Sequence, residues 1–234
     1  MLWYKAWLET RARFCIALVL CVALCCELVI VLPRSGITDD RMTALHGVNF
    51  TLAFVWIMSI TLLMMGGLLG ERANGSSSFT LSLPVSRLHL ISVRIAVGLI
   101  QGVALAAVPW VAMLVAAGVV GKGRSLSQAG FHVFLLLAGG VVFLAAALLL
   151  SSFIEGEHTA PIVGLGAIIM LAYILSGKDL IPYSPLSFMM GLQYYNYRTS
   201  LLTGSLPWLH AMVFVAVAAC LLAISVKAIQ RRDF

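Results

Sequence analysis

The chain consists of long apolar runs separated by short polar connections. Six runs are long enough to predict membrane-spanning helices, since a span needs about 20 mostly apolar residues. The runs are continuous and do not alternate in polarity, as the strands of a membrane barrel do. We therefore predict an all-α integral membrane protein, a single domain over residues 1–234. Its spans are Phe14–Leu32, Val48–Leu69, Ile91–Val120, Ala129–Phe153, Pro161–Ser176 and Pro207–Val226.

Composition supports lipid as the solvent of this chain. Of its 234 residues, 62% are hydrophobic and 10% are charged, and the mean hydropathy is +1.04. A typical soluble domain carries about 25% charged residues. Six spans leave no room for a soluble catalytic domain. The five cysteines all lie in the first and last apolar runs, where cysteine usually behaves as a small hydrophobe.

The distribution of lysine and arginine indicates the orientation. With the amino end inside, nine basic residues lie on the cytoplasmic side and six on the outer side. Basic residues favour the cytoplasmic side, so we predict an inner-membrane protein with both termini in the cytoplasm. The net charge of +6 is spread along the chain without a basic block. It relates to this orientation, and we expect no nucleic-acid partner.

The amino-terminal stretch allows two interpretations. Lys5, Glu9 and Arg13 are spaced four apart and would form a charged ladder on one helix face. Trp3 and Trp7 lie on another face. The stretch is either a helix lying in the inner membrane interface, with its tryptophans at headgroup level, or a helical extension of the first span.

Residues Gly177–Leu206 are too polar to span and too apolar to remain fully solvated. On the predicted topology this region is extracytoplasmic. We expect short helices or a re-entrant excursion resting against the outer interface. Tyr194 and Tyr195 suit that depth, either as aromatic anchors or as residues of a substrate pathway or interface.

Two charged residues of the spans need an explanation. Glu27 is the only acid inside a span, and a charge at mid-membrane costs about 2.5–3.5 kcal/mol on insertion scales. It faces the bundle interior, a subunit interface or a translocation path, or it lies near the outer headgroups or is protonated. Arg94 opens the third span and is expected to snorkel to the cytoplasmic surface.

Small residues predict close helix packing at two places. Gly66 and Gly70 end the second span, and Gly98 and Gly102 lie on one face of the third. A glycine every fourth residue lets two helix backbones approach closely. The pattern leaves open whether the contact is within the chain or between chains.

Two stretches of the sequence only partly match catalytic or metal-binding motifs. "AGVVGKG", residues 117–123, lacks the first glycine and the final Ser or Thr of a phosphate-binding loop. "EGEH", residues 155–158, has ligand-type side chains, but neighbours on a turn seldom converge on a metal ion. We therefore predict a non-enzymatic chain that binds neither a metal nor a cofactor. An integral membrane enzyme centred on "EGEH" is the weakest alternative.

The longest polar interruption between the early runs is "ERANGSSSFTLSLPVSR", Glu71–Arg87. From Phe79 to Ser86 apolar and polar residues alternate, which favours a strand. A short helix over residues 75–82 that ends before Pro84 fits equally well. Either conformation offers a small apolar face to the cytoplasm.

Three stretches together resemble a known family. "SLPVSR" lies between the second and third spans, "KAIQRRDF" ends the chain, and "YSPLSF" is followed by "LLTGSLPW" before the last span. In these positions the chain resembles type-2 ABC exporter permeases, the transmembrane subunits of ABC transporters. The resemblance covers the layout of the whole chain.

The resemblance implies a role for residues 70–90. They would form the coupling helix region, which docks into a groove on a separate ATP-binding subunit. By position, the contact residues would be Glu71, Arg72, Phe79, Leu83, Pro84 and Arg87. Arg87 would pair with an acid of the partner, and Phe79 and Leu83 would supply the apolar contact.

The resemblance also implies an assembly. Two ATPase copies would hold ATP and Mg, and a second permease, identical or similar, would complete the transporter. The expected activity is export of a hydrophobic or amphipathic substrate. The alternative is a mechanotransmitter that passes ATP energy to an extracytoplasmic partner without moving a substrate.

Overall fold

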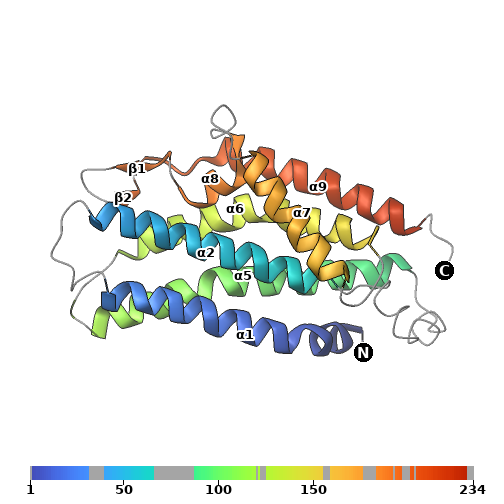
Figure 1. The fold of residues 1–234 in the computed structure, drawn as a ribbon, viewed down its shortest axis with the longest axis horizontal. Helices are drawn as coiled ribbons and strands as arrows, with labels where there is room; N and C mark the ends of the chain where they lie inside the picture. The colour runs from blue at the N-terminus through green and yellow to red at the C-terminus, as the bar shows by residue number, and fades with distance from the viewer. Residues whose placement is uncertain are drawn as a thin grey trace.

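The computed structural model is an elongated bundle of long helices that run along its longest axis (Figure 1). It describes residues 2–31, 40–65, 87–119, 121, 125–154, 159–175, 183–191, 193–196, 201–202 and 204–230. The elements are α1 (Leu2–Val31), α2 (Asp40–Met64), α5 (Arg87–Val119), α6 (Leu126–Ser151), α7 (Thr159–Leu175), α8 (Pro185–Met189), β1 (Tyr195–Asn196), β2 (Leu201–Leu202) and α9 (Trp208–Gln230).

The predicted all-α membrane architecture is found. Each of the six apolar runs lies largely within one long helix, although α2 begins at Asp40, well before the predicted start of its span. Within the described residues, three helical stretches have the length and composition to cross a membrane: Leu88–Val119, Leu126–Ser151 and Trp208–Ala228. Asn49–Met64 and Pro161–Leu175 are shorter apolar helices.

Helix α6 lies at the centre of the bundle. It packs against α2, α5, α7, α8 and α9, and 67% of its apolar window is buried, compared with 22% for α9. Glycines and alanines on α6, including Gly139, Gly140 and Ala145, are buried and let these neighbours approach on several sides. These five helices therefore take their positions from α6, whereas α1 packs on α5 and α2.

The indole of Trp56 joins three helices. Trp56 on α2 is 2% exposed, and its Nε1–H donates to the carbonyl oxygen of Gly102 on α5 at 3.1 Å. Its ring lies directly against Gly140 on α6, where an added Cβ would overlap the ring carbons. Two glycines thus make the space for one large side chain.

The glycine pair of the third predicted span packs inside the chain. Gly98 lies against Met64, and a Cβ on Gly102 would meet Ile60 Cδ1 at 3.1 Å. Both neighbours belong to α2, so the close approach is between α5 and α2. Gly66 and Gly70 lie outside the described residues.

Helix α1 decides between the two interpretations of the amino-terminal stretch. It is one continuous helix from Leu2 to Val31, so the charged residues extend the first span and a separate interfacial helix is not formed. Trp3 is 50% exposed, while the ring of Trp7 packs on that of Phe14, with centroids 5.5 Å apart. The aromatic face of this extension is partly used for packing within α1.

The region before the last helix forms a small layer against α6. Helix α8 is buried at every residue, with Ser184 Oγ accepting a hydrogen bond from Ser187 N as its N-cap. Gly139 of α6 leaves room for the backbone of α8 at Pro185. The short helix was expected, but it packs into the core and does not rest on the surface.

Strands β1 and β2 pair antiparallel. Strand β2 is also hydrogen-bonded to α6. The side-chain amide of Gln128 donates to Leu202 O at 2.9 Å and accepts from Leu202 N at 3.0 Å. Figure 1 shows this hairpin at one end of the bundle and both chain termini at the other.

The contact between Trp56 and Gly140 yields a stability test. We expect Gly140→Ala to lower the unfolding temperature in mild detergent, because overpacking a filled core costs about 1–3 kcal/mol. Gly130→Ala is the matched control, since Gly130 lies on the same helix with open space around it. Alanine is the better helix former by about 0.5–1 kcal/mol, so the control should be unchanged or more stable. Equal unfolding temperatures for the two variants would contradict the role of this contact.

Candidate functional site

Most residues of the predicted docking segment lie outside the described residues. These are Glu71, Arg72, Phe79, Leu83 and Pro84. Arg87 is the first residue of α5, and its side chain is not described. The structure describes the elements that flank the segment, which are the end of α2 and the start of α5, and the neighbouring part of α1.

Two arginines hold the end of α2. Arg13 of α1 donates through Nη1 to the carbonyl oxygens of Leu62 and Met65, each at 3.2 Å. Arg94 of α5 donates through Nη2 to Met64 O at 3.4 Å. Arg94 is half-buried beside α2, whereas the sequence led us to expect that it snorkels to the surface.

This arrangement follows from helix chemistry. The last four carbonyls of a helix have no partner within the helix, and the helix dipole places partial negative charge there. A guanidinium carries several donors in a fixed fork and stays charged. The arginine pair (Arg13 and Arg94) therefore caps α2 at the point where residues 66–86 begin.

A second polar contact joins α1 to α5 next to the arginine pair. Gln101 is 1% exposed and donates through Nε2 to Thr10 Oγ1 at 2.7 Å. Thr10 Oγ1 in turn donates to Ala6 O at 3.0 Å. Among the described residues, Gln101 Oε1 has no hydrogen-bond partner. It borders a cavity of about 10 Å³ that is also lined by Glu9 and Arg94, close to the smallest space that holds one water.

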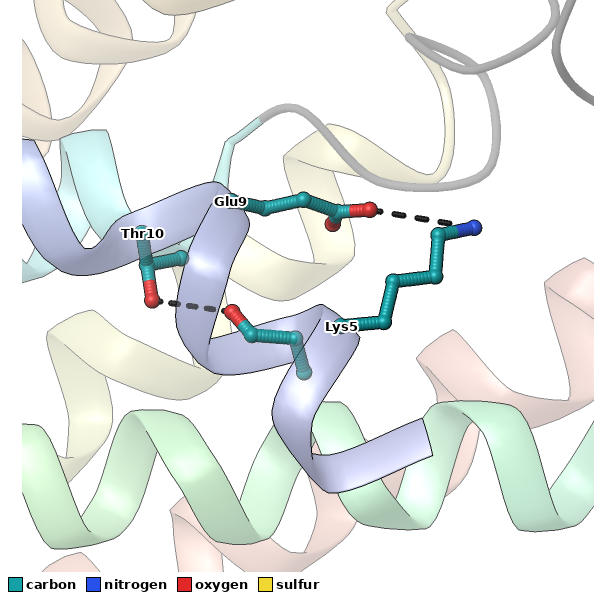
Figure 2. A network of polar contacts seen from close by, with 4 residues as sticks. Lys5, Glu9 and Thr10 are labelled. Atoms are coloured by element: carbon teal, nitrogen blue, oxygen red, sulfur yellow. Dashed lines mark hydrogen bonds and ion pairs between the residues drawn. The ribbon is translucent and has the colours of Figure 1, made fainter. Parts of the chain in front are cut away.

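Figure 2 shows the outer face of this cluster on α1. Lys5 Nζ and Glu9 Oε1 are 3.7 Å apart. The Thr10 hydroxyl points to the carbonyl oxygen of Ala6 in the preceding turn. Both charged side chains are more than a third exposed, so the ion pair contributes little to stability. The predicted ladder is thus present between Lys5 and Glu9, while Arg13 reaches across to α2.

The other candidate residues are dispersed. Glu27 is exposed on α1, in line with Ile16, Leu20 and Ala23. Tyr194 is partly buried near the other end of the bundle, and its ring makes edge contacts with Phe131 and Phe188 at 6.2 and 5.9 Å. The side chain of Tyr195, in β1, is not described.

Tyr194 has an unusual environment. Its hydroxyl is buried and has no hydrogen-bond partner among the described residues, and this burial raises the pKa of the phenol. A buried phenol normally finds a partner. The described contacts of this tyrosine are therefore aromatic packing.

The cysteines and acids give no sign of a metal centre in the described part of the chain. Cys21 and Cys25 are fully buried with Met113, as expected for small hydrophobes, whereas Cys15 and Cys220 are exposed. No three His, Cys, Asp or Glu side chains gather there in a way that would hold a metal ion. The "EGEH" stretch lies outside the described residues.

Sequence reasoning missed the residues that organise this site. Arg13 was assigned to a ladder along α1, and Thr10, Gln101 and Trp56 were not singled out. These residues carried a weak signal, because Thr10 and Arg13 are polar residues at the margin of an apolar run and Gln101 interrupts one. Their partners lie 49 to 91 residues away along the chain, which no local pattern reveals.

Comparison with known proteins supplies the family. No curated protein matches the sequence. A sequence model of a family described as "ABC-2 family transporter protein" matches residues 28–229, from the last turn of α1 almost to the end of α9. This agrees with the resemblance carried by the three sequence stretches. The chain belongs to the ABC-2 transporter family of membrane proteins, whose members associate with an ABC ATPase.

Proposed function

We propose that the chain is the permease subunit of an ATP-driven exporter. It would have six spans and both termini in the cytoplasm, and it would work with a second permease, identical or similar, and two ATPase copies that hold ATP and Mg. The observation that carries the proposal is the family match, which extends over nearly all the described helices. The start of α1 and the end of α9 lie at the same end of the bundle, which is consistent with an even number of spans (Figure 1).

The ATPase would dock on residues 70–90, which include the first turn of α5. Phe79, Leu83 and Pro84 would supply the apolar contact, and Glu71, Arg72 and Arg87 the charged rim. Both described ends of this segment are firmly held. α2 ends on the arginine pair, and α5 packs along α1.

The arginine pair would transmit the motion of the ATPase. A push on residues 66–86 acts on the end of α2, and a frayed helix end would absorb it as local unwinding. Arg13 and Arg94 tie this end to α1 and α5. The three helices would then move as one body, which is how a small displacement is carried over a distance through packed elements.

The cargo would be hydrophobic or amphipathic. The buried polar residues of the described part are Asn49, Ser59, Thr61, Gln101, His132, Ser151, Ser152, Ser184, Ser187 and Ser225. This set contains no Asp, Glu, Lys or Arg, so the described interior offers no line of charges for a small ion.

Glu27 would face the second permease. It belongs to an exposed stripe of α1 with Ile16, Leu20 and Ala23, which is otherwise apolar. An acid facing lipid is costly, whereas a partner helix or a shared aqueous cavity would satisfy it. This stripe is therefore the proposed contact with the other half.

The docking assignment is tested by one charge in the apolar contact. We expect Leu83→Asp or Phe79→Asp to abolish copurification with the ATPase and its stimulation, while the protein still inserts, because an aspartate desolvated in an apolar contact lacks a partner. Leu126→Asp is the control, a 76% exposed leucine at the start of α6.

Normal stimulation in the Leu83 and Phe79 variants would remove the docking assignment. ATPase stimulation by the wild-type complex without movement of any substrate across proteoliposomes would favour the mechanotransmitter over the exporter.

The arginine pair is tested by removing its donors. In the double variant Arg13→Met and Arg94→Met we expect the ATPase to remain bound but its stimulation to fall several-fold, because the end of α2 frays. Stability should fall by about 1.5–3 kcal/mol, the value of one hydrogen bond to a charged group, because the three bonds that are lost are long or partly exposed. Arg11→Met is the matched control, an exposed arginine on the same helix. Unchanged stimulation in the double variant would show that α2 needs no such tie.

The role of Glu27 is tested by Glu27→Gln, with Glu27→Asp as the conservative control. We expect the glutamine variant to lower the dimeric fraction of the permease in mild detergent, measured by light scattering after size exclusion, and to lower transport with it. The aspartate variant should retain most of both. If Glu27→Gln preserves pairing, stability and transport, the acid is merely tolerated at this position.

A further inference from the structure

A groove runs along the surface between α5 and α9, with α6 as its floor. Its volume is about 580 Å³, within the range of about 300–1,000 Å³ typical of ligand pockets. Val103 of α5 and Met212 of α9 form its walls and are 48% and 68% exposed. Ala138 and Leu144 of the floor are buried. The groove is therefore a concave surface that opens outward from the bundle.

The lining is apolar along its length. Apart from backbone groups, polar atoms occur only in the indoles of Trp56 and Trp208. The Nε1–H of Trp56 is already bonded to Gly102 O. A polar ligand group in the groove would lose its hydrogen bonds to water without replacement. The part of the ligand inside the groove is therefore a hydrocarbon chain. A polar group of the same molecule is accommodated only at the Trp208 end.

The length of the groove matches one membrane leaflet. Along α9 the lining extends from Trp208 to Ala219, about 16 Å at 1.5 Å per residue. The hydrocarbon core of a bilayer is about 30 Å thick, so the groove covers about half of it. Its walls and floor belong to the three helical stretches with the length and composition to cross a membrane.

Trp208 marks the headgroup end. It is the first residue of α9 and is 61% exposed, and its ring is held edge-on against Phe134 with centroids 5.0 Å apart. Tryptophan is enriched where the hydrocarbon meets the headgroups. The groove thus begins at headgroup level and ends near the middle of the membrane.

We propose that this groove binds one acyl chain of a membrane phospholipid, with the headgroup beside Trp208 and the chain end near Leu144. The proposal depends on the chain's place in a membrane and not on the transport function, so either can fail without the other. The site differs from the ATPase docking segment and from the stripe of α1 that carries Glu27.

The floor of the groove gives a specific readout. The walls contact bulk lipid in any case, whereas Ala138 and Leu144 line the groove and are otherwise buried. The full-length protein is reconstituted in phosphatidylcholine nanodiscs containing a phosphatidylcholine with a diazirine near the end of one acyl chain. After illumination, labelled peptides are identified by mass spectrometry. We expect labelling of the α6 floor near Leu144, and labelling closer to Trp208 when the diazirine is near the glycerol.

Filling the groove should remove this labelling. In Ala216→Trp we expect floor labelling to fall at least five-fold, because an indole in the wall occupies the path of the chain. Ala223→Trp is the matched control, an exposed alanine two turns farther along α9 and outside the lining, and its floor labelling should equal that of the wild type. Met212→Trp repeats the test if Ala216→Trp does not elute as a single folded species.

Three outcomes would overturn the proposal. One is absence of floor labelling in the wild type. Another is equal labelling in the groove-filling and control variants. The third is a cross-link from α9 to a second copy or another protein that protects the floor, because the occupant would then be a protein helix.

Discussion

The bundle depends on how the indole of Trp56 is accommodated inside a membrane protein. An indole N–H has no water to bond in this solvent, so it must find a protein acceptor. It finds the backbone carbonyl of Gly102 on α5, and its ring fills the space that Gly140 leaves on α6. One side chain therefore sets the spacing of α2, α5 and α6. Helices α5 and α9 make few contacts with each other, and the groove lies between them with α6 as its floor.

The end of α2 is held by a different kind of interaction. In the middle of the bundle, shape decides the packing, whereas at this end two guanidinium groups satisfy carbonyls that the helix itself leaves open. The Trp56 contact and the arginine hydrogen bonds act on the same helix, the first near its middle and the second at its end. Helix α2 is thereby fixed against tilting at Trp56 and against unwinding at Met64. The described part of α2 therefore ends at a firmly held point, which is what the proposed docking of an ATPase on the segment after it would require.

The sequence allowed the helices to be predicted but not their contacts. Hydropathy located every long helix, yet it missed the start of α2 at Asp40, because hydropathy detects membrane depth and not helical conformation. The spacing of Gly98 and Gly102 predicted a close approach and left the partner open, since spacing describes one helix surface only. Trp56 looked like any aromatic of an apolar run. Arg13 fitted a local ladder, and only the fold reveals its bonds to α2, about 50 residues away.

The exposed surfaces of α1 and α9 differ in chemistry, and this difference supports the two proposed contacts, with a second permease and with lipid. Helices α1 and α9 lie at opposite edges of the bundle (Figure 1). The exposed stripe of α1 carries Glu27, an acid whose cost in hydrocarbon is about 2.5–3.5 kcal/mol. Helix α9 carries no Asp, Glu, Lys or Arg from Trp208 until Lys227, and its wall of the groove is apolar throughout. Helix α9 therefore exposes most of its surface to lipid without the cost of burying a charge. The stripe of α1 avoids that cost only against a partner that hydrogen-bonds or solvates Glu27.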